Sequence, residues 1–389
     1  MLRTVIAAVL CAAVTVPPMQ TKQIVNAGPA PVGPYSAAVN AGGLIYLSGT
    51  IAQDDKGALV GDGDAAAQTK RIIERMREVL KASGSSLEQV VAVTVYLRSA
   101  SDFPVMNDTY KAFWPKDPPT RTTVITDLVL GADVEISMIA VPNGAERKVI
   151  HPADWVKSPN PYSYAIRTGD TLFLSGLVPR NGKDNTPVGG DIRAQTKAVM
   201  ENAGQLLKAA GMDFTNLVSA KVYLPNAADF REMNNEYRRY FALPSTPPAR
   251  ATVKAGLAGA QYAVEMTFVA SASPREPYAP VENLSGAVKA GNRIYLSGLL
   301  GHTSDTLGDV TAQTREVMSR IRKMLEVNGY TADHVVDAVV YLTDLTQFSK
   351  MNEEYRAVFG KDFPARATVG TGLMAEGAVV EIMVTAVKQ

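Results

Sequence analysis

The sequence is 389 residues long, with 46% hydrophobic and 20% charged residues, a balance typical of a soluble globular protein. Its 39 basic residues nearly equal its 38 acidic ones, so the chain lacks the basic surplus of nucleic-acid-binding proteins. No apolar run reaches the roughly 18 residues that a membrane-spanning helix needs. The single cysteine excludes an internal disulfide, and the histidines lack the spacing of metal ligands. We therefore expect neither a metal nor a cofactor.

The N-terminal segment has the pattern of a targeting signal. Arg3 precedes an apolar stretch, Thr4–Val16, which ends at Pro17-Pro18 and is too short to span a bilayer. The pattern predicts a signal peptide over residues 1–20 and export to the periplasm or beyond, with no membrane association after processing. The alternative is an N-terminal strand or tail.

The elements that follow alternate between strands and helices. Leu44–Leu47 predicts a strand that enters the Ser48-Gly49 turn. Asp64–Ser83 predicts a helix with one apolar face that stops at Gly84, and Val90–Leu97 predicts a strand. A second helix, Phe103–Trp114, with Pro104 in its first turn, and two strands, Arg121–Thr126 and Asp133–Val141, complete the unit.

This unit occurs three times. The Ala-Gln-Thr motif, for example, recurs at Gln68, Gln195 and Gln313, and the other motifs keep their order around it. Each interval is large enough for an independent domain and too long for a solenoid repeat. We predict an α+β protein of three tandem domains, each a mixed sheet with two helices on one face. The predicted domains span residues 21–142, 148–272 and 276–389.

Each repeat carries an arginine at the start of one predicted strand and, 14 or 15 residues later, a glutamate on the next predicted strand. The arginines are Arg121, Arg250 and Arg366, and the glutamates are Glu135, Glu265 and Glu381. An arginine can bind a carboxylate with two parallel hydrogen bonds, and a glutamate can orient or deprotonate a water molecule. A Ser-Gly turn could add a backbone N–H donor, so the set suits the hydrolysis of a small acid. The same residues could instead form a structural ion pair between two strands of one repeat.

Several motifs of the first repeat resemble, in the same order, those of the Rid (YjgF/RidA) family. They are Gly33-Pro34-Tyr35-Ser36, Tyr46-Leu47-Ser48-Gly49, Ala67-Gln68-Thr69, residues 105–110, residues 119–124 and Val134-Glu135-Ile136. All three repeats match. The resemblance implies a chorismate-mutase-like fold, which assembles as a trimer with clefts between subunits. We expect the three domains of this chain to form that arrangement within one monomer, as a pseudotrimer.

The resemblance also implies roles for residues of this chain. The three arginines would bind the substrate carboxylate, and the three glutamates would handle water. The substrate-binding residues would be Tyr35, Ser48, Gly49, Asn107, Thr123, Tyr162, Ser175, Gly176, Asn234, Thr252, Ser297, Gly298, Asn352 and Thr368. The three glycines among them would offer backbone amides.

One repeat departs from the pattern. The third repeat has Leu284 where the others have Tyr35 and Tyr162. In the family the arginine of one subunit meets the tyrosine of the next. We therefore expect one of the three clefts to differ from the other two.

The resemblance implies a hydrolase, an enamine/imine deaminase that converts 2-imino acids to keto acids and ammonia. The expected partner is a small carboxylate, imino acid or keto acid, and not a nucleic acid. A carboxylate-binding or chaperone-like protein without catalysis is the main alternative. A ribonuclease is a third possibility, which the near-neutral charge disfavours.

Overall fold

The computed structural model describes residues 22–28, 31–241 and 246–388. The predicted signal peptide lies outside the described residues. Among the helices of these ranges, none has the length and apolarity to cross a membrane.

The first domain is a mixed sheet covered by two helices. The strands are β1 (Gln23–Val25), β2 (Ala38–Ala41), β3 (Leu44–Ile51), β4 (Val90–Leu97), β5 (Thr120–Ile125) and β7 (Val134–Ala140). They lie in the order β1-β2-β3-β7-β4-β5, with β4 and β5 parallel and the other neighbours antiparallel. The predicted α+β fold is therefore confirmed.

Both helices form where the sequence predicts them. Helix α1 (Ala65–Ala82) begins after Asp64, whose side chain accepts a hydrogen bond from the N–H of Ala67. Its buried face includes Ile72, Ile73, Met76 and Leu80, at the spacing of an amphipathic helix.

The second helix, α2 (Phe103–Lys111), is shorter than predicted. It begins with Pro104 in its first turn, where a missing N–H costs little. After Lys111 the chain tightens, and the N–H of Ala112 donates to the carbonyl of Thr109.

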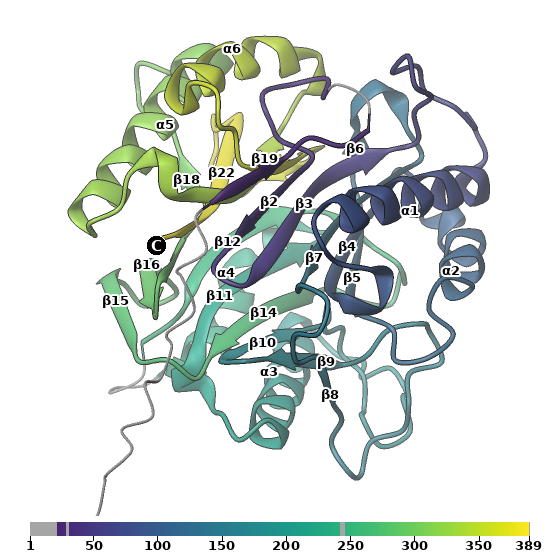
Figure 1. The fold of residues 1–389 in the computed structure, drawn as a ribbon. Helices are drawn as coiled ribbons and strands as arrows, with labels where there is room; N and C mark the ends of the chain where they lie inside the picture. Colours follow the sequence, from purple (N-terminus) through teal and green to yellow (C-terminus); the bar gives the residue numbers. More distant parts are fainter. Residues whose placement is uncertain (1–21, 29–30, 242–245, 389) are drawn as a thin grey trace, which may run out of the picture.

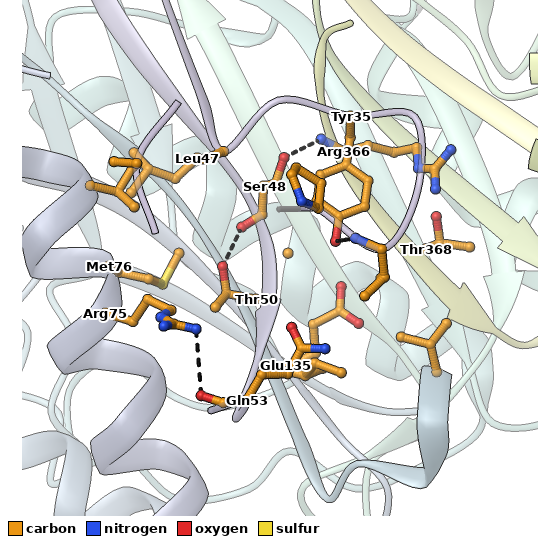
Figure 2. Close-up of a pocket in the computed structure, with 18 of the residues that line it drawn as sticks. Tyr35, Leu47, Ser48, Thr50, Gln53, Arg75, Met76, Glu135, Arg366 and Thr368 are labelled. Atoms are coloured by element: carbon orange, nitrogen blue, oxygen red, sulfur yellow. Dashed lines mark hydrogen bonds between the residues drawn. The ribbon is translucent and has the colours of Figure 1, made fainter. Parts of the chain in front are cut away.

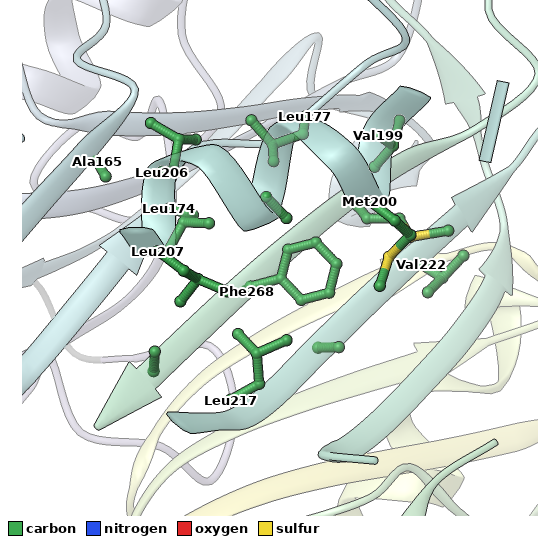
Figure 3. Close-up of a cluster of buried hydrophobic side chains, with 14 of the residues drawn as sticks. Ala165, Leu174, Leu177, Val199, Met200, Leu206, Leu207, Leu217, Val222 and Phe268 are labelled. Carbon is green, nitrogen blue, oxygen red and sulfur yellow. The ribbon is translucent and has the colours of Figure 1, made fainter. Parts of the chain in front are cut away.

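The other two domains repeat this layout. The second contains β8 (Lys148–Ile150), β9 (Ala165–Thr168), β10 (Thr171–Leu174), α3 (Ile192–Ala209), β11 (Leu217–Leu224), α4 (Phe230–Tyr237), β12 (Ala249–Lys254) and β14 (Glu265–Ser271). The third contains β15 (Arg275–Pro280), β16 (Ser285–Ala290), β17 (Arg293–Leu296), β18 (Leu299–Leu300), α5 (Val310–Val327), β19 (Val335–Leu342), α6 (Phe348–Phe359), β20 (Ala365–Gly370) and β22 (Val380–Val387). Figure 3 shows how Val199, Met200, Leu206 and Leu207 of α3 pack against Phe268 of the sheet.

Three very short strands connect the domains. Strand β6 (Asp127–Leu128) of the first domain pairs with β20 of the third, β13 (Gly256–Leu257) of the second pairs with β5 of the first, and β21 (Gly372–Leu373) of the third pairs with β12 of the second. Each domain thus extends the sheet of a neighbour, and the three exchanges close a ring. These strands could not be predicted from the sequence, because each has only two residues and its partner lies in another domain.

A shared apolar core lies where the three sheets meet. The tyrosines of the three Val-Tyr-Leu motifs, Tyr96, Tyr223 and Tyr341, are each 1% exposed and belong to one cluster of buried side chains. That cluster draws residues from all three domains. In Figure 1 the strands converge at the centre, while α1 and α2, α3, and α5 and α6 lie around the outside. The backbone hydrogen bonds of the exchanged strands and the side chains of the shared core therefore both hold the three domains in the pseudotrimeric arrangement.

We predict that the protein is a monomer in solution. The strand exchanges are satisfied within one chain, and tethering keeps the domains at an effective concentration of roughly millimolar or more. Light scattering should give a mass of 41.5 kDa, or slightly less after removal of the predicted signal peptide. A stable assembly of three chains would contradict this prediction.

Candidate active site in three clefts between domains

The arginine of each domain faces the glutamate of another domain. We name the clefts by these pairs: cleft A (Arg366 and Glu135), cleft B (Arg121 and Glu265) and cleft C (Arg250 and Glu381). Figure 2 shows cleft A, where Arg366 lies beside the ring of Tyr35 and Glu135 comes from the opposite wall. The empty space, open solvent included, is about 770 Å³ in cleft A and about 530 Å³ in cleft B.

The sheet order explains this cross-domain pairing. Strand β4 separates β5, which carries Arg121, from β7, which carries Glu135. The same separation holds in the other two sheets. A structural ion pair within one repeat, the alternative that the sequence left open, is therefore wrong.

The serines of the Ser-Gly turns hold the arginine strands in place. In cleft A the backbone N–H of Arg366 donates to Oγ of Ser48 (2.8 Å), and this hydroxyl donates to the carbonyl of Ser36 (2.6 Å). The equivalent serine bonds are Arg121 to Ser175 (2.9 Å) and Arg250 to Ser297 (2.8 Å). Ser48 lines cleft A, as predicted, but the buried hydroxyls of Ser48, Ser175 and Ser297 are used to join neighbouring domains. Their substrate-binding role stays a prediction.

The glycines make room for the glutamates. A Cβ atom on Gly49 would overlap Oε1 of Glu135, and Gly176 and Gly298 stand in the same relation to Glu265 and Glu381. Their expected role as amide donors is wrong for two of the three. The N–H of Gly176 donates to the carbonyl of Arg121 (3.1 Å), and that of Gly298 donates to the carbonyl of Arg250 (3.2 Å).

The Ala-Gln-Thr motif fixes the start of each glutamate strand. Oε1 of Gln68 accepts hydrogen bonds from the N–H groups of Asp133 (2.9 Å) and Val134 (3.1 Å), directly before Glu135. The equivalent bonds join Gln195 to Ala263 (2.8 Å) and Gln313 to Val379 (2.9 Å). This buried glutamine therefore positions the carboxyl group without touching the cleft.

Each guanidinium group is buried against an aromatic ring of its own domain. The residues Arg121, Arg250 and Arg366 are 4%, 3% and 2% exposed. Their Cζ atoms lie 4.8, 4.8 and 4.7 Å from the ring centres of Tyr110, Tyr237 and Tyr355. Burial lowers the pKa of each arginine, yet a guanidinium stays charged in proteins.

The hydrogen bonds of these arginines are incomplete. Oδ1 of Asn107 accepts from Nη2 of Arg121 (2.8 Å), and Oδ1 of Asn234 accepts from Nη2 of Arg250 (2.8 Å). In cleft A all three guanidinium nitrogens of Arg366 lack a partner among the described residues, and so does Oδ1 of Asn352. Burying a cation whose N–H groups lack hydrogen-bond partners costs free energy, so each cleft favours the binding of an anion.

The glutamates are buried without a salt bridge. None of the ion pairs among the described residues joins a cleft arginine to its glutamate. Burial raises the pKa of Glu135, Glu265 and Glu381 to about 8, although the facing arginines oppose the shift. Each carboxyl group can therefore both release and accept a proton near neutral pH.

The threonines line the gap between cation and carboxyl. Thr368 lines cleft A and Thr123 lines cleft B, as predicted from the sequence. The backbone N–H of Thr123 donates to Oε1 of Glu265 (3.4 Å). The hydroxyls of Thr252 and Thr368 are buried and have no partner in the described part of the chain.

The predicted tyrosines lie where the sequence analysis placed them. The ring centre of Tyr35 is 5.3 Å from Cζ of Arg366, and that of Tyr162 is 5.9 Å from Cζ of Arg121. Each tyrosine comes from the domain that faces the arginine. The expected contact between the arginine of one domain and the tyrosine of the next is therefore confirmed in clefts A and B.

Cleft C differs at this wall. Leu284 takes the tyrosine position, and the N–H of the following Ser285 donates to the carbonyl of Pro248 (3.0 Å). Cleft A has the same backbone bond, from Ser36 to Pro364 (3.0 Å), so the loop is held alike in both. Beside Leu284, Glu282 forms an ion pair with Arg238 (2.6 Å) across the domain boundary.

Two further aromatic residues, not predicted from the sequence, lie in the clefts. The ring centre of Phe103 lies 5.7 Å from Cζ of Arg121, and that of Phe348 lies 5.6 Å from Cζ of Arg366. Both begin a helix, and Phe230 begins the matching helix of the second domain. The recurrence of a phenylalanine at the same position of all three repeats could have indicated a cleft residue from the sequence alone.

The comparisons with known proteins agree with the geometry. A family model described as Endoribonuclease L-PSP matches residues 25–142, 154–272 and 275–388. A 2-iminobutanoate/2-iminopropanoate deaminase of Dermatophagoides farinae is 36% identical over 126 residues, which are 32% of this chain and 98% of that protein. The 3-aminoacrylate deaminase RutC of Acinetobacter baylyi is 35% identical over 113 residues, which are 29% of this chain and 90% of that protein.

A solved structure extends the likeness beyond one domain. A chorismatase structure aligns with a TM-score of 0.54 at 16% identity, over 77% of this chain and 93% of that one. At this identity the likeness concerns the fold alone. The three family matches, together with the deaminase relatives, show that the chain belongs to the Endoribonuclease L-PSP family, the Rid (YjgF/RidA) proteins, as three tandem domains.

Proposed function

We propose that the protein hydrolyses small 2-imino carboxylates to 2-keto acids and ammonia. One observation carries the proposal: each cleft holds a buried guanidinium with N–H groups that have no partner among the described residues, opposite a buried carboxyl group with a raised pKa. The two groups form no ion pair, so a small anion can lie between them.

The arginine supplies the binding site for the substrate carboxylate. A planar guanidinium can donate two parallel hydrogen bonds to a carboxylate. In clefts A and B the rings of Tyr35 and Tyr162 lie beside this guanidinium, and Phe348 and Phe103 add a second aromatic wall. These walls would exclude water from the ion pair and hold the imine carbon toward the glutamate.

The glutamate would transfer the proton. Its carboxylate form removes a proton from water as the water oxygen bonds to the imine carbon. The resulting carboxylic acid then gives this proton to the nitrogen, which completes a neutral carbinolamine. The carboxylate next takes the proton of the carbinol hydroxyl and passes it to the nitrogen, so that the hydroxyl oxygen becomes the keto oxygen, the C–N bond breaks and ammonia leaves. The glutamate returns to its carboxylate form, so one water is consumed for each keto acid and ammonia released. A pKa of about 8 suits a group that acts as base and then as acid.

The names of relatives support this reaction class. Two relatives are named as deaminases of 2-iminobutanoate/2-iminopropanoate and of 3-aminoacrylate. A carboxylate-binding protein without catalysis would use the same arginines, so turnover decides between the two. Ribonuclease activity is disfavoured by the absence of a basic surplus in the chain.

Cleft C would contribute less to this activity. Leu284 can fill the apolar space of the missing tyrosine, but it offers neither a flat ring nor a hydroxyl. The only ring in cation–π contact with Arg250 among the described residues is Tyr237 of its own domain. A small carboxylate in cleft C would therefore have a weaker aromatic wall, and a bulkier apolar ligand would fit there better.

Replacing Arg121 and Arg366 together by glutamine should abolish most of the activity. Each change removes the charged partner of the substrate carboxylate, which costs on the order of 2–5 kcal/mol and so well over tenfold in kcat/KM. Ammonia release from freshly generated 2-iminopropanoate measures the effect. Lysine at the two positions should rescue poorly because it lacks the two-pronged donor geometry.

The matched control is Arg250→Gln, which changes only cleft C and should leave most of the activity. Circular dichroism and thermal unfolding establish that each variant is folded. Wild-type turnover by a folded double variant would remove these arginines from the proposed mechanism. Keto-acid binding without any turnover by the wild type would favour a binding protein.

The pH dependence of kcat/KM should reflect the pKa of the buried glutamates. Because the carboxylate form starts the reaction, kcat/KM should rise with pH below about 8 and level off above it. The rate should be corrected for uncatalysed imine hydrolysis at each pH. Glu135→Gln combined with Glu265→Gln should remove both the activity and this pH dependence. A wild-type profile that falls through the same range would mean that the protonated glutamate starts the reaction.

A further inference from the structure

A further space, distinct from clefts A and B, lies where all three domains meet. Its lining includes Tyr46 of the first domain, Phe173 and Lys221 of the second, and Tyr295 and Asp337 of the third. It shares no lining residue with the pockets of clefts A and B. We call it the central cavity, and it encloses about 500 Å³ of empty space, open solvent included.

The two charged residues of the central cavity break the threefold repeat. They lie on equivalent strands, two and four residues before the tyrosine of each Val-Tyr-Leu motif. At the position of Lys221 the other domains have Thr94 and Val339. At the position of Asp337 they have Ala92 and Ser219.

Only a chain with tandem domains can carry this asymmetry, because each domain has its own sequence. A trimer of identical subunits would place three lysines or three aspartates around the axis, and the like charges would repel each other. Here one cation and one anion occur where the other repeats are neutral. Shared ancestry of the repeats therefore does not account for the pair.

The two charges face the cavity without meeting. Neither Lys221 nor Asp337 takes part in an ion pair or in a hydrogen bond to another side chain among the described residues, although both line the same space. Burial lowers the pKa of Lys221 and raises that of Asp337, and each residue opposes the shift of the other. Two unpaired charges that line one cavity call for a partner that carries both opposite charges.

The walls of the cavity add an apolar surface. Tyr46, Phe173 and Tyr295 occupy the same position in the three domains, and all three are buried. The aromatic rings can pack against a short side chain, while the ends of a ligand reach the two charges. A ligand with only one charge would leave the other cavity charge uncompensated.

We propose that the central cavity binds a small α-amino acid as its zwitterion. The ligand carboxylate pairs with the Lys221 ammonium, the ligand ammonium pairs with the Asp337 carboxylate, and the side chain lies among the aromatic rings. This site is independent of the proposed deaminase reaction. It requires neither the cleft arginines nor the cleft glutamates.

Isothermal titration with L-alanine tests the proposal. The titration is made on the full chain in saturating pyruvate, so that the clefts are occupied. We expect one alanine per chain. Propionate and ethylammonium carry only one of the two charges and should bind at least about tenfold more weakly, because each leaves one cavity charge unpaired.

The chain itself offers the matched variants. Lys221→Thr and Asp337→Ser introduce the residues that other domains carry at the same positions, Thr94 and Ser219. Each variant should lose alanine binding by at least about tenfold while its keto-acid binding in the clefts stays unchanged. Failure of the wild type to bind alanine, or alanine binding that survives in both variants, would overturn the proposal. The comparison of the three probes on the wild type decides the matter even where a variant does not fold.

Discussion

The exchange of short strands between domains is the constraint on which the clefts depend. Each domain lends two residues to the sheet of a neighbour, and each serine of a Ser-Gly turn binds the backbone of the next domain's arginine. These contacts hold the guanidinium of one domain opposite the carboxyl group of another. No domain contains a complete site. A cleft therefore forms only when two folded domains pack against each other.

Joining three copies in one chain changes what the clefts can become. In an assembly of identical subunits every cleft must change together, whereas here Leu284 alters cleft C alone. The same freedom applies at the axis, where Lys221 and Asp337 each occur once. The tandem chain keeps the residues that hold the domains together, such as the three serines of the Ser-Gly turns and the shared-core tyrosines Tyr96, Tyr223 and Tyr341. It varies single positions that would contact a ligand, such as Leu284.

Local patterns made much of the fold predictable. Asp64 before an apolar face predicted α1 to within one residue at each end, and the repeated motifs predicted three domains. The two-residue strands could not be predicted because their hydrogen-bond partners belong to other domains. The sequence identified the arginines, glutamates and tyrosines that the structure brings together. It could not show that Ser48 is used up by backbone partners, or that the amide of Gly176 is already bonded, because both facts depend on the neighbouring domain.

The central claim is that an active cleft takes its arginine and its glutamate from two different domains. Two double variants test it with the same kinds of substitution. Arg366→Gln with Glu135→Gln disables only cleft A and should retain about half of the wild-type kcat, since independent sites contribute additively. Arg366→Gln with Glu265→Gln disables clefts A and B and should leave little activity. Equal activity of the two folded double variants in the imine hydrolysis assay would contradict the cross-domain site.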